Sequence, residues 1–391
     1  MRQVSLLVLT GVFGLGLRPV PAATPAAAQF TVERATDWEA LFDRTSGWTG
    51  SDACYSIPLS GVDAPGSAAL GSTLFLFGDT FIGEVGEDGA RLSGFSFVNN
   101  TAARLDAAIP DPAALTFSWG TNPQGQPDAV FTPTIPVSAP QDWFWPQDGF
   151  SSGGTVRMFG LRLEPSSSSV GFSIVGVSVL SWPAADPLPS PNLVETVAPL
   201  FLPGVDWIGD VVFGTAVMAN TAAAGAPFPD GYLYVYGYRN EPSNKRLLAA
   251  RVLPDDVDDF SRWRFWDGAA WQPDIALAAP LTGRVSAELS MTPLPDGRFL
   301  LVFQLDTISR NVVARVASSP IGPFGPTRQI WRCPEPDQWD GAWCYNAKAH
   351  PHLSGPGELI ISYNVNTQKV RDLVGIAEIY RPRFIRVRVE P

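Results

Sequence analysis

The amino-acid sequence predicts an all-β fold, and three observations lead to this prediction. The 36 glycines and 37 prolines are scattered along the 391 residues, so turns are frequent throughout. Short apolar runs lie between these turn residues, and no long apolar stripe of helical period replaces them. Several of the runs also resemble one another. These are residues 73–80, 155–162, 232–239, 299–306 and 358–365.

The five runs repeat one pattern, in which an aromatic residue follows an apolar stretch. The aromatic residues are Phe77, Phe159, Tyr236, Phe303 and Tyr363. Runs that are apolar on both faces fit strands packed between neighbouring sheets. Sheets that recur without helical crossovers are typical of propeller blades. The sequence therefore predicts a five-bladed β-propeller that forms a single domain over residues 29–391, closed by pairing of the last strand with the segment after Gln29.

The first 28 residues have the pattern of a secretory signal peptide. Arg2 precedes an apolar run over residues 4–17, and small residues follow up to Ala28. The run is short for a membrane span and is followed by Arg18 and prolines. We therefore expect a secreted or periplasmic protein with no membrane insertion.

The formal net charge of −11 narrows the set of partners. An acidic surface repels nucleic acid and anionic membranes, so we expect no nucleic-acid partner. Neutral ligands such as oligosaccharides are compatible with this charge. We expect a monomer.

The three cysteines predict no zinc site built on sulfur, because no closely spaced pair is present. Cys333 and Cys344 flank a short segment and could close a loop, which suits an oxidising compartment. Cys54 has uncharged neighbours, and we expect it to be buried and inert.

An ionisable residue precedes each of the five similar runs, at the start of a predicted innermost strand. These residues are Asp52, Asp148, Asp210, Glu288 and His350. The starts of the innermost strands of a propeller surround the mouth of its central channel, so we expect these side chains to converge there. Asp79, two residues after Phe77 in the first run, adds a second carboxylate from the first blade.

A ring of carboxylates favours acid–base chemistry on a carbohydrate. Crowded like charges raise the pKa of one carboxyl, so that a proton donor and a proton acceptor coexist at neutral pH. Aromatic faces suit the C–H faces of sugars, and tryptophans stand beside three of the acids. We expect Asp148, Asp210, His350, Trp48, Trp145 and Trp207 to bind a polysaccharide or oligosaccharide. We expect no required cofactor. The space between the oxygen atoms of these acids could hold a calcium ion or water molecules alone.

The ordered set of motifs resembles a known family. "GWTGSDACYSI", "LFLFGDTFIG", "FVNNT", "SAELSM" and "AHPHLS" are similar to segments of the five-bladed endo-D-arabinanases of glycoside hydrolase family 183. This resemblance implies hydrolysis of D-arabinofuranosyl linkages, with Asp52 and Asp79 as catalytic residues. A more distant similarity to the propellers of families 43 and 117 implies Glu288 as a rival proton donor.

Three functions are compatible with the sequence. The first is a secreted glycoside hydrolase that cleaves arabinofuranosyl-type linkages, with D-arabinan as the expected substrate. The second is a carbohydrate-binding propeller without catalysis, which would bind sugars but not turn them over. The third is a propeller scaffold for protein contacts. Release of reducing ends from an arabinan distinguishes the first from the other two.

Overall fold

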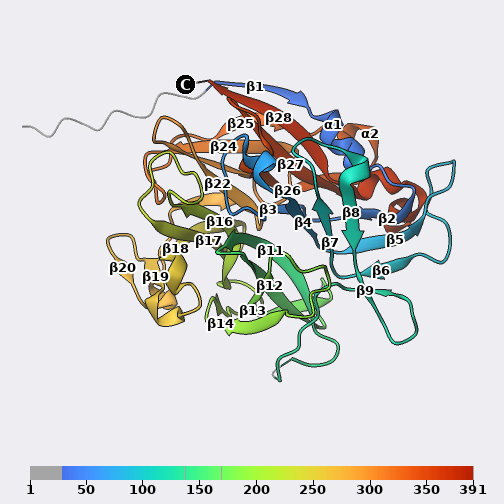
Figure 1. Ribbon diagram of the computed structural model, residues 1–391, viewed down its shortest axis with the longest axis horizontal. Coiled ribbons are helices and arrows are strands. Elements are labelled where there is room, and N and C mark those ends of the chain that lie inside the picture. The colour runs from blue at the N-terminus through green and yellow to red at the C-terminus, as the bar shows by residue number, and fades with distance from the viewer. Residues whose placement is uncertain (1–28, 137, 169, 391) are drawn as a thin grey trace, which may run out of the picture.

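The computed structural model describes residues 29–390 except 137 and 169, and this part of the chain is mostly β-strand (Figure 1). Its α-helices are short: α1 (Thr36–Glu39), α2 (Glu335–Gln338) and α3 (Val370–Gly375). Within the described residues, no helix has the length and apolar character needed to cross a membrane. The signal peptide predicted for residues 1–28 lies outside the described part.

The main sheets share one plan, in which consecutive segments pair antiparallel from the centre of the molecule outwards. In chain order, their strands are β3 (Tyr55–Pro58), β4 (Thr73–Phe77), β7 (Thr101–Leu105) and β8 (Leu115–Ser118); β11 (Trp143–Ser152), β12 (Thr155–Pro165), β13 (Phe172–Pro183) and β14 (Val194–Ala198); β16 (Val211–Asn220), β17 (Tyr232–Glu241), β18 (Asn244–Val252) and β19 (Arg264–Trp266); β22 (Leu289–Pro293), β23 (Phe299–Gln304), β24 (Asn311–Ala317) and β25 (Arg328–Arg332); and β26 (Ala342–His350), β27 (Glu358–Thr367), β28 (Arg383–Glu390) and β1 (Gln29–Arg34).

Smaller strands extend this plan. A three-stranded sheet has the order β2 (Ser46–Ser51), β5 (Thr80–Glu84) and β6 (Ser96–Val98), and a two-stranded sheet pairs β9 (Gly120–Thr121) with β10 (Pro127–Asp128). The sheet of β16 also contains β15 (Phe201–Leu202), β20 (Trp271–Gln272) and β21 (Thr282–Val285), which brings it to seven strands.

The inner strands form a closed ring. β3 contacts β11, β11 contacts β16, β16 contacts β22, β22 contacts β26, and β26 contacts β3. Apolar core clusters lie between successive sheets around this ring, so each sheet is buried on both faces. Every residue of β4 and β23 is buried for this reason. The all-β, propeller-like fold is confirmed, whereas the count of five blades stays a prediction, because the additional sheets depart from a simple repeat.

The repeated aromatic residues occupy matching strands. Each lies on the second strand of its sheet, namely β4, β12, β17, β23 or β27, and each is fully buried: Phe77, Phe159, Tyr236, Phe303 and Tyr363. Their large apolar area explains why the pattern recurs, since each ring fills the space between two sheets.

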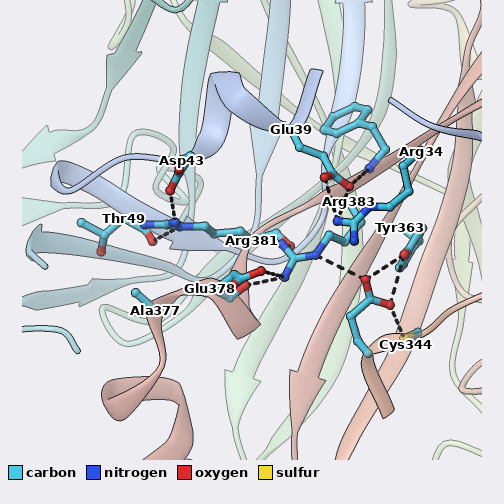
Figure 2. A network of polar contacts seen from close by, with 12 residues as sticks. Arg34, Glu39, Asp43, Thr49, Cys344, Tyr363, Ala377, Glu378, Arg381 and Arg383 are labelled. Carbon is cyan, nitrogen blue, oxygen red and sulfur yellow. Dashed lines mark hydrogen bonds and ion pairs between the residues drawn. The ribbon is translucent and has the colours of Figure 1, made fainter. Parts of the chain in front are cut away.

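The two ends of the described chain close the ring. β1 pairs antiparallel with β28 from Gln29–Glu390 to Arg34–Ile385, as the alternating C-terminal sequence predicts. A network of charged groups, in which Arg381 and Arg383 are buried, lies at the same closure (Figure 2). Arg34 forms an ion pair with Glu39, and Arg381 forms hydrogen bonds with Thr49 and Arg44 backbone oxygens. The N-terminal segment is therefore fixed to the C-terminal one by both backbone and side chains.

Candidate active site

Asp52 and Asp79 lie side by side where two sheets meet. Asp52 stands between β2 and β3, and Asp79 stands between β4 and β5. The Asp52 N–H donates to the Asp79 carbonyl oxygen (3.1 Å), and the Gly78 N–H donates to the Asp52 carbonyl oxygen (3.1 Å). These reciprocal backbone hydrogen bonds hold the two aspartates together, as the resemblance implies.

Gly78 explains why a glycine precedes Asp79. A Cβ atom at this position would lie 2.3 Å from Oδ1 of Asp52, which is closer than atoms can approach. The absence of a side chain at Gly78 therefore makes room for the Asp52 carboxyl group. The short "GDT" motif thus contains one catalytic candidate and the space for the other.

Asp52 is surrounded by groups that favour its neutral form. Burial raises the pKa of Asp52 well above its ordinary value, and the negative charges of Asp79 and Glu288 raise it further. Hydrogen bonds from Tyr380 and Tyr345 oppose this increase. The Tyr345 hydroxyl donates to Oδ2 of Asp52 at 3.2 Å. Asp52 is therefore the carboxyl group of the pair whose protonated form its surroundings favour.

The surroundings of Asp79 stabilise its ionised form better than those of Asp52 do. Burial raises its pKa to about 6, while hydrogen bonds from Trp145 and Asn99 lower it. The Trp145 indole N–H donates to Oδ1 of Asp79 at 2.9 Å. The surroundings therefore favour the protonated form of Asp52 more strongly than that of Asp79, and such a difference between two carboxyls suits acid–base catalysis.

Glu288 contributes a further carboxylate, and its partner is a buried lysine. Glu288 directly precedes β22 and forms an ion pair with Lys348 of β26, and both side chains are buried. Burial raises the pKa of Glu288, and the charge and hydrogen bond of Lys348 lower it. The Lys348 ammonium also lies 4.2 Å from the centre of the Tyr55 ring. Glu288 therefore has a nearby cation to compensate its charge, unlike the other two acids.

Asp148 lies in the channel but not at the start of its strand, which corrects the expected position. It lies within β11, at a bulge between Pro146 and Gly149 that turns the backbone inward. Its carboxylate accepts hydrogen bonds from the N–H groups of Gly149 (2.8 Å) and Val217 (2.6 Å). Burial nevertheless raises its pKa to about 7. Asp148, Tyr55 and Lys348 line a small cavity of about 40 Å³ between the inner strands.

His350 does not stand at the start of its strand, so the prediction of its position is wrong, although it lines the same cavity as Asp148. It is the last residue of β26 rather than the first, because the strand begins at Ala342 and Pro351 follows its end. Its ring is buried, with hydrogen bonds to the hydroxyls of Ser56 (2.6 Å) and Ser362 (2.7 Å). Burial and the neighbouring charge of Lys348 lower its pKa well below the ordinary value. His350 is a neutral core residue that joins two sheets.

The tryptophans differ in the surface that they offer. Trp48 is 1% exposed and stacks on Phe117 with ring centres 4.9 Å apart, so the prediction that it binds a sugar is wrong. Trp145 is partly exposed beside Asp79. Trp207 is 54% exposed on a turn, and its predicted contact with substrate stays a prediction.

Asp210 directly precedes β16, as expected, but it has a structural partner. Its Oδ1 accepts a hydrogen bond from the Gly204 N–H at 2.6 Å, which holds the turn between β15 and β16. Burial raises its pKa, while the charge of Lys245 lowers it. A substrate contact by Asp210 stays a prediction.

Three residues of the site were missed in the sequence. Lys348 stands two residues before His350, and a charge inside an apolar strand is the signal that could have identified it. Tyr345 lies three residues earlier on the same strand. Tyr380 ends a short 3-10 helix (Ala377–Tyr380) after α3, and no local pattern connects it with Asp52.

In the part of the chain that the structure describes, Asp52, Asp79 and Glu288 do not form a compact set of metal ligands. Among the described residues, the group of three donor atoms within 4.8 Å of one another consists of Cys333, Glu335 and Cys344, which lies apart from Asp52, Asp79 and Glu288. The predicted calcium ion stays a prediction, and the chemistry below does not use it.

The comparisons with known proteins agree with this architecture. A family model described as "Domain of unknown function (DUF5005)" matches residues 35–389. No curated protein matches the chain. A Bacteroides ovatus structure, described as that of a candidate hydrolase, has a TM-score of 0.70 at 20% identity and covers 92% of this chain and 90% of its own. At this identity, the likeness shows a shared fold.

Two further structures are more distant. The α-L-arabinofuranosidase of Podospora anserina, solved with cellotriose, has a TM-score of 0.44 at 11% identity, over 88% of this chain and 97% of its own. The endo-arabinase of Bacteroides thetaiotaomicron has a TM-score of 0.40 at 14% identity, over 80% of this chain and 92% of its own.

Proposed function

The chain belongs to the DUF5005 family, and we propose that this member is a glycoside hydrolase. One observation carries the proposal: Asp52 and Asp79 are held side by side by reciprocal backbone hydrogen bonds, in surroundings that separate their pKa values. Hydrolysis of a glycosidic bond needs one protonated and one ionised carboxyl group near the same atom. The predicted fold, the acidic site and the sequence resemblance support the same function.

In the proposed reaction, Asp52 is the general acid. Its proton moves to the glycosidic oxygen as the bond to the anomeric carbon breaks, and the leaving sugar departs as an alcohol. Asp79 supplies the negative charge that acts on the anomeric carbon, either directly or by removing a proton from the attacking water. Tyr345 and Tyr380 orient the acid, and Trp145 orients Asp79.

Glu288 acts in this scheme as an electrostatic partner rather than as the proton donor. Burial raises the pKa of Glu288 and the ion pair with Lys348 opposes this rise; in the proposal the ion pair keeps Glu288 charged, so that it has no proton to give. The negative charge of Glu288 instead raises the pKa of Asp52 and keeps the donor protonated. Lys348 is thus a positioning residue, because it fixes Glu288 and its charge.

The proposed substrate is a polysaccharide or oligosaccharide with arabinofuranosyl linkages, and D-arabinan is the first candidate. The sequence resemblance supports this choice, and the partly exposed Trp145 beside Asp79 offers a surface for a sugar ring. We also propose that the protein acts outside the cytoplasm as a monomer, with residues 1–28 removed.

A panel of polysaccharides and aryl glycosides tests the proposal. The parent protein and the Asp52→Asn variant are incubated with D-arabinan, L-arabinan, xylan and fructan, and new reducing ends are measured. We expect release from D-arabinan by the parent and little release by the variant. Binding without release, by both proteins and on every substrate, would instead favour a carbohydrate-binding propeller.

A further inference from the structure

Cys333 and Cys344 lie together in the core, away from the proposed active site. Their sulfur atoms and a carboxylate oxygen of Glu335 all lie within 4.8 Å of one another, and all three residues are fully buried. Both thiols are unbonded in the structure. Neither residue has a part in the proposed hydrolysis, so the cluster needs its own explanation.

The backbone already fixes the spacing of the two cysteines. The Cys333 N–H donates to the Arg310 carbonyl oxygen at 2.8 Å, and the Cys344 carbonyl oxygen accepts from the Ser309 N–H at 3.2 Å. Two neighbouring residues of one loop therefore hold both cysteines, one at each side. The two sulfur atoms, which lie within 4.8 Å of each other, are therefore carried by backbone segments that this loop holds at a fixed spacing.

The surroundings disfavour a metal ion between these groups. Cys344, Tyr363 and Arg383 converge on one carboxylate in Figure 2, which is that of Glu335. The Arg383 guanidinium lies 3.4 Å from Oε1 of Glu335, so a divalent cation there would face a fixed positive charge. The cluster also offers three donors among the described residues, whereas structural zinc sites use four.

We propose that Cys333 and Cys344 form a disulfide bond in the mature protein. The reaction is thiol–disulfide exchange with a disulfide-bonded donor, such as a thiol oxidoreductase or oxidised glutathione. The thiolate of one cysteine attacks the donor disulfide, and the thiolate of the other then displaces the donor from the mixed disulfide. The protein loses two protons and two electrons, and the donor leaves as two thiols.

This bond would brace the strand that supports the proposed acid. Cys344 directly precedes Tyr345, whose hydroxyl reaches Asp52. The disulfide closes the segment that contains α2 and ties the end of β25 to the start of β26. Since both sulfur atoms are buried, exchange occurs before the two sheets pack, and reductants reach the bond only after unfolding.

Thiol counting tests the proposal and does not depend on any enzymatic activity. The full-length protein is produced with export to an oxidising compartment and alkylated in denaturant, before and after reduction. Of the three cysteines, we expect Cys54 alone to be alkylated before reduction and all three after it, with the peptides of Cys333 and Cys344 linked after digestion. Three alkylated thiols before reduction would overturn the disulfide, and three thiols with stoichiometric zinc by elemental analysis would replace it with a metal centre.

Thermal unfolding provides a second measurement. Reduction in denaturant followed by refolding without oxidant should lower Tm by about 4 °C, since the unfolded chain regains the freedom that the closed loop removed. The double variant Cys333→Ser, Cys344→Ser should show no such dependence on reduction. The variant Cys54→Ser is the matched control, and it should keep the parent's response. An equal response in the parent and the double variant would contradict the proposal.

Discussion

The closure of the ring and the candidate active site both bury charged groups, but they compensate these charges differently. At the closure, acids and arginines are paired: Glu335 with Arg383, Glu39 with Arg34, and Asp43 with Arg381 (Figure 2). At the active site, the described ion pairs give Asp52, Asp79 and Glu288 a single cation, Lys348, which lies against Glu288. One network is balanced in that each of its acids faces an arginine, whereas in the other two of the three carboxyl groups have no cationic partner among the described ion pairs.

This difference separates structure from function. A balanced network satisfies its charges and holds two distant chain segments together, so its purpose is met by folding alone. An excess of buried carboxyls raises pKa values and opposes folding. Such destabilising groups are kept where they perform chemistry.

The largest expected effect comes from removing a titrating group of the active site. Asp52→Asn and Asp79→Asn keep the shape of each side chain but remove its ability to exchange a proton. We expect turnover on the cleaved substrate to fall at least ~100-fold in each variant. Rates measured at saturating substrate, with folding checked by circular dichroism, test this.

The matched control is Asp106→Asn, an exposed acid near the same sheets whose ion pair with Arg104 lies at the surface. Its turnover should stay near that of the parent. Nearly normal turnover in both Asp52→Asn and Asp79→Asn would move the acid–base role to Glu288.

Substitutions at the ring closure should lower the stability of the protein and leave its turnover unchanged. Glu335→Gln removes the fully buried charge that faces Arg383 and leaves that cation with the largely exposed Glu378 as its remaining acidic partner. We expect the free energy of unfolding to fall by about 3–5 kcal/mol, with turnover per folded molecule unchanged. Urea unfolding provides the measurement, and Glu164→Gln, at an exposed strand position, should change stability by less than about 0.5 kcal/mol.

The paired variant sharpens this test. Glu335→Gln combined with Arg383→Met removes both charges, and it should recover part of the lost stability. If Glu335→Gln proves as stable as the parent but loses turnover, the closure network belongs to the active site and the comparison fails.

A smaller effect, on the pH dependence of kcat/KM, should follow from replacing Lys348. Lys348→Met raises the pKa of Glu288, so that Glu288 becomes neutral and no longer raises the pKa of Asp52. Asp52 then loses its proton at lower pH, and the alkaline limb of kcat/KM should move down by roughly one pH unit. Glu288→Gln should move the limb in the same direction. An unchanged pH profile in both variants, with reduced stability alone, would show a purely structural role for Lys348.

The sequence identifies the parts of the molecule that repeat. The buried aromatic of each second strand recurs because every sheet must fill the same space, and a repeated requirement leaves a repeated pattern. The same holds for Asp52 and Asp79, whose position beside a turn and a glycine is a local feature. These elements are predictable because the physical cause lies within a few residues.

Other parts of the site depend on distant segments. Tyr380 reaches Asp52 from the end of a short 3-10 helix near the C-terminus. Lys348, on β26, reaches Glu288 at the start of the neighbouring sheet. His350 was misplaced because the start of β26 lies eight positions before it, and the apolar pattern does not mark that boundary. Trp48 was misjudged because a tryptophan beside an acid in sequence can point to the opposite face of a strand. Burial and strand ends are set by the tertiary packing.

The last prediction concerns the stability cost of the excess charge, which should appear as a dependence on pH. Asp79 has a pKa of about 6 in the folded protein, above its ordinary value of 3.8. Below pH 3.8 the carboxyl is protonated in both states and contributes nothing. Between about pH 3.8 and 6, the folded protein keeps a proton that the unfolded chain has released, so the free energy of unfolding falls as the pH rises, by at most about 1.4 kcal/mol per pH unit.

Asp79→Asn removes this titration while keeping an oxygen that can accept the Trp145 hydrogen bond. Relative to the parent, the variant should therefore gain stability as the pH rises from 4 to 6, and the gain should stay constant at higher pH. Urea unfolding of both proteins from pH 4 to 8 measures this difference, with Asp106→Asn as a control that should show no gain in the same window. A difference that does not change with pH would mean that the Asp79 charge costs the fold nothing. A variant that is less active yet more stable above pH 6 would instead identify the charge as one kept for chemistry, because at the ring closure the removal of an acid should weaken the fold.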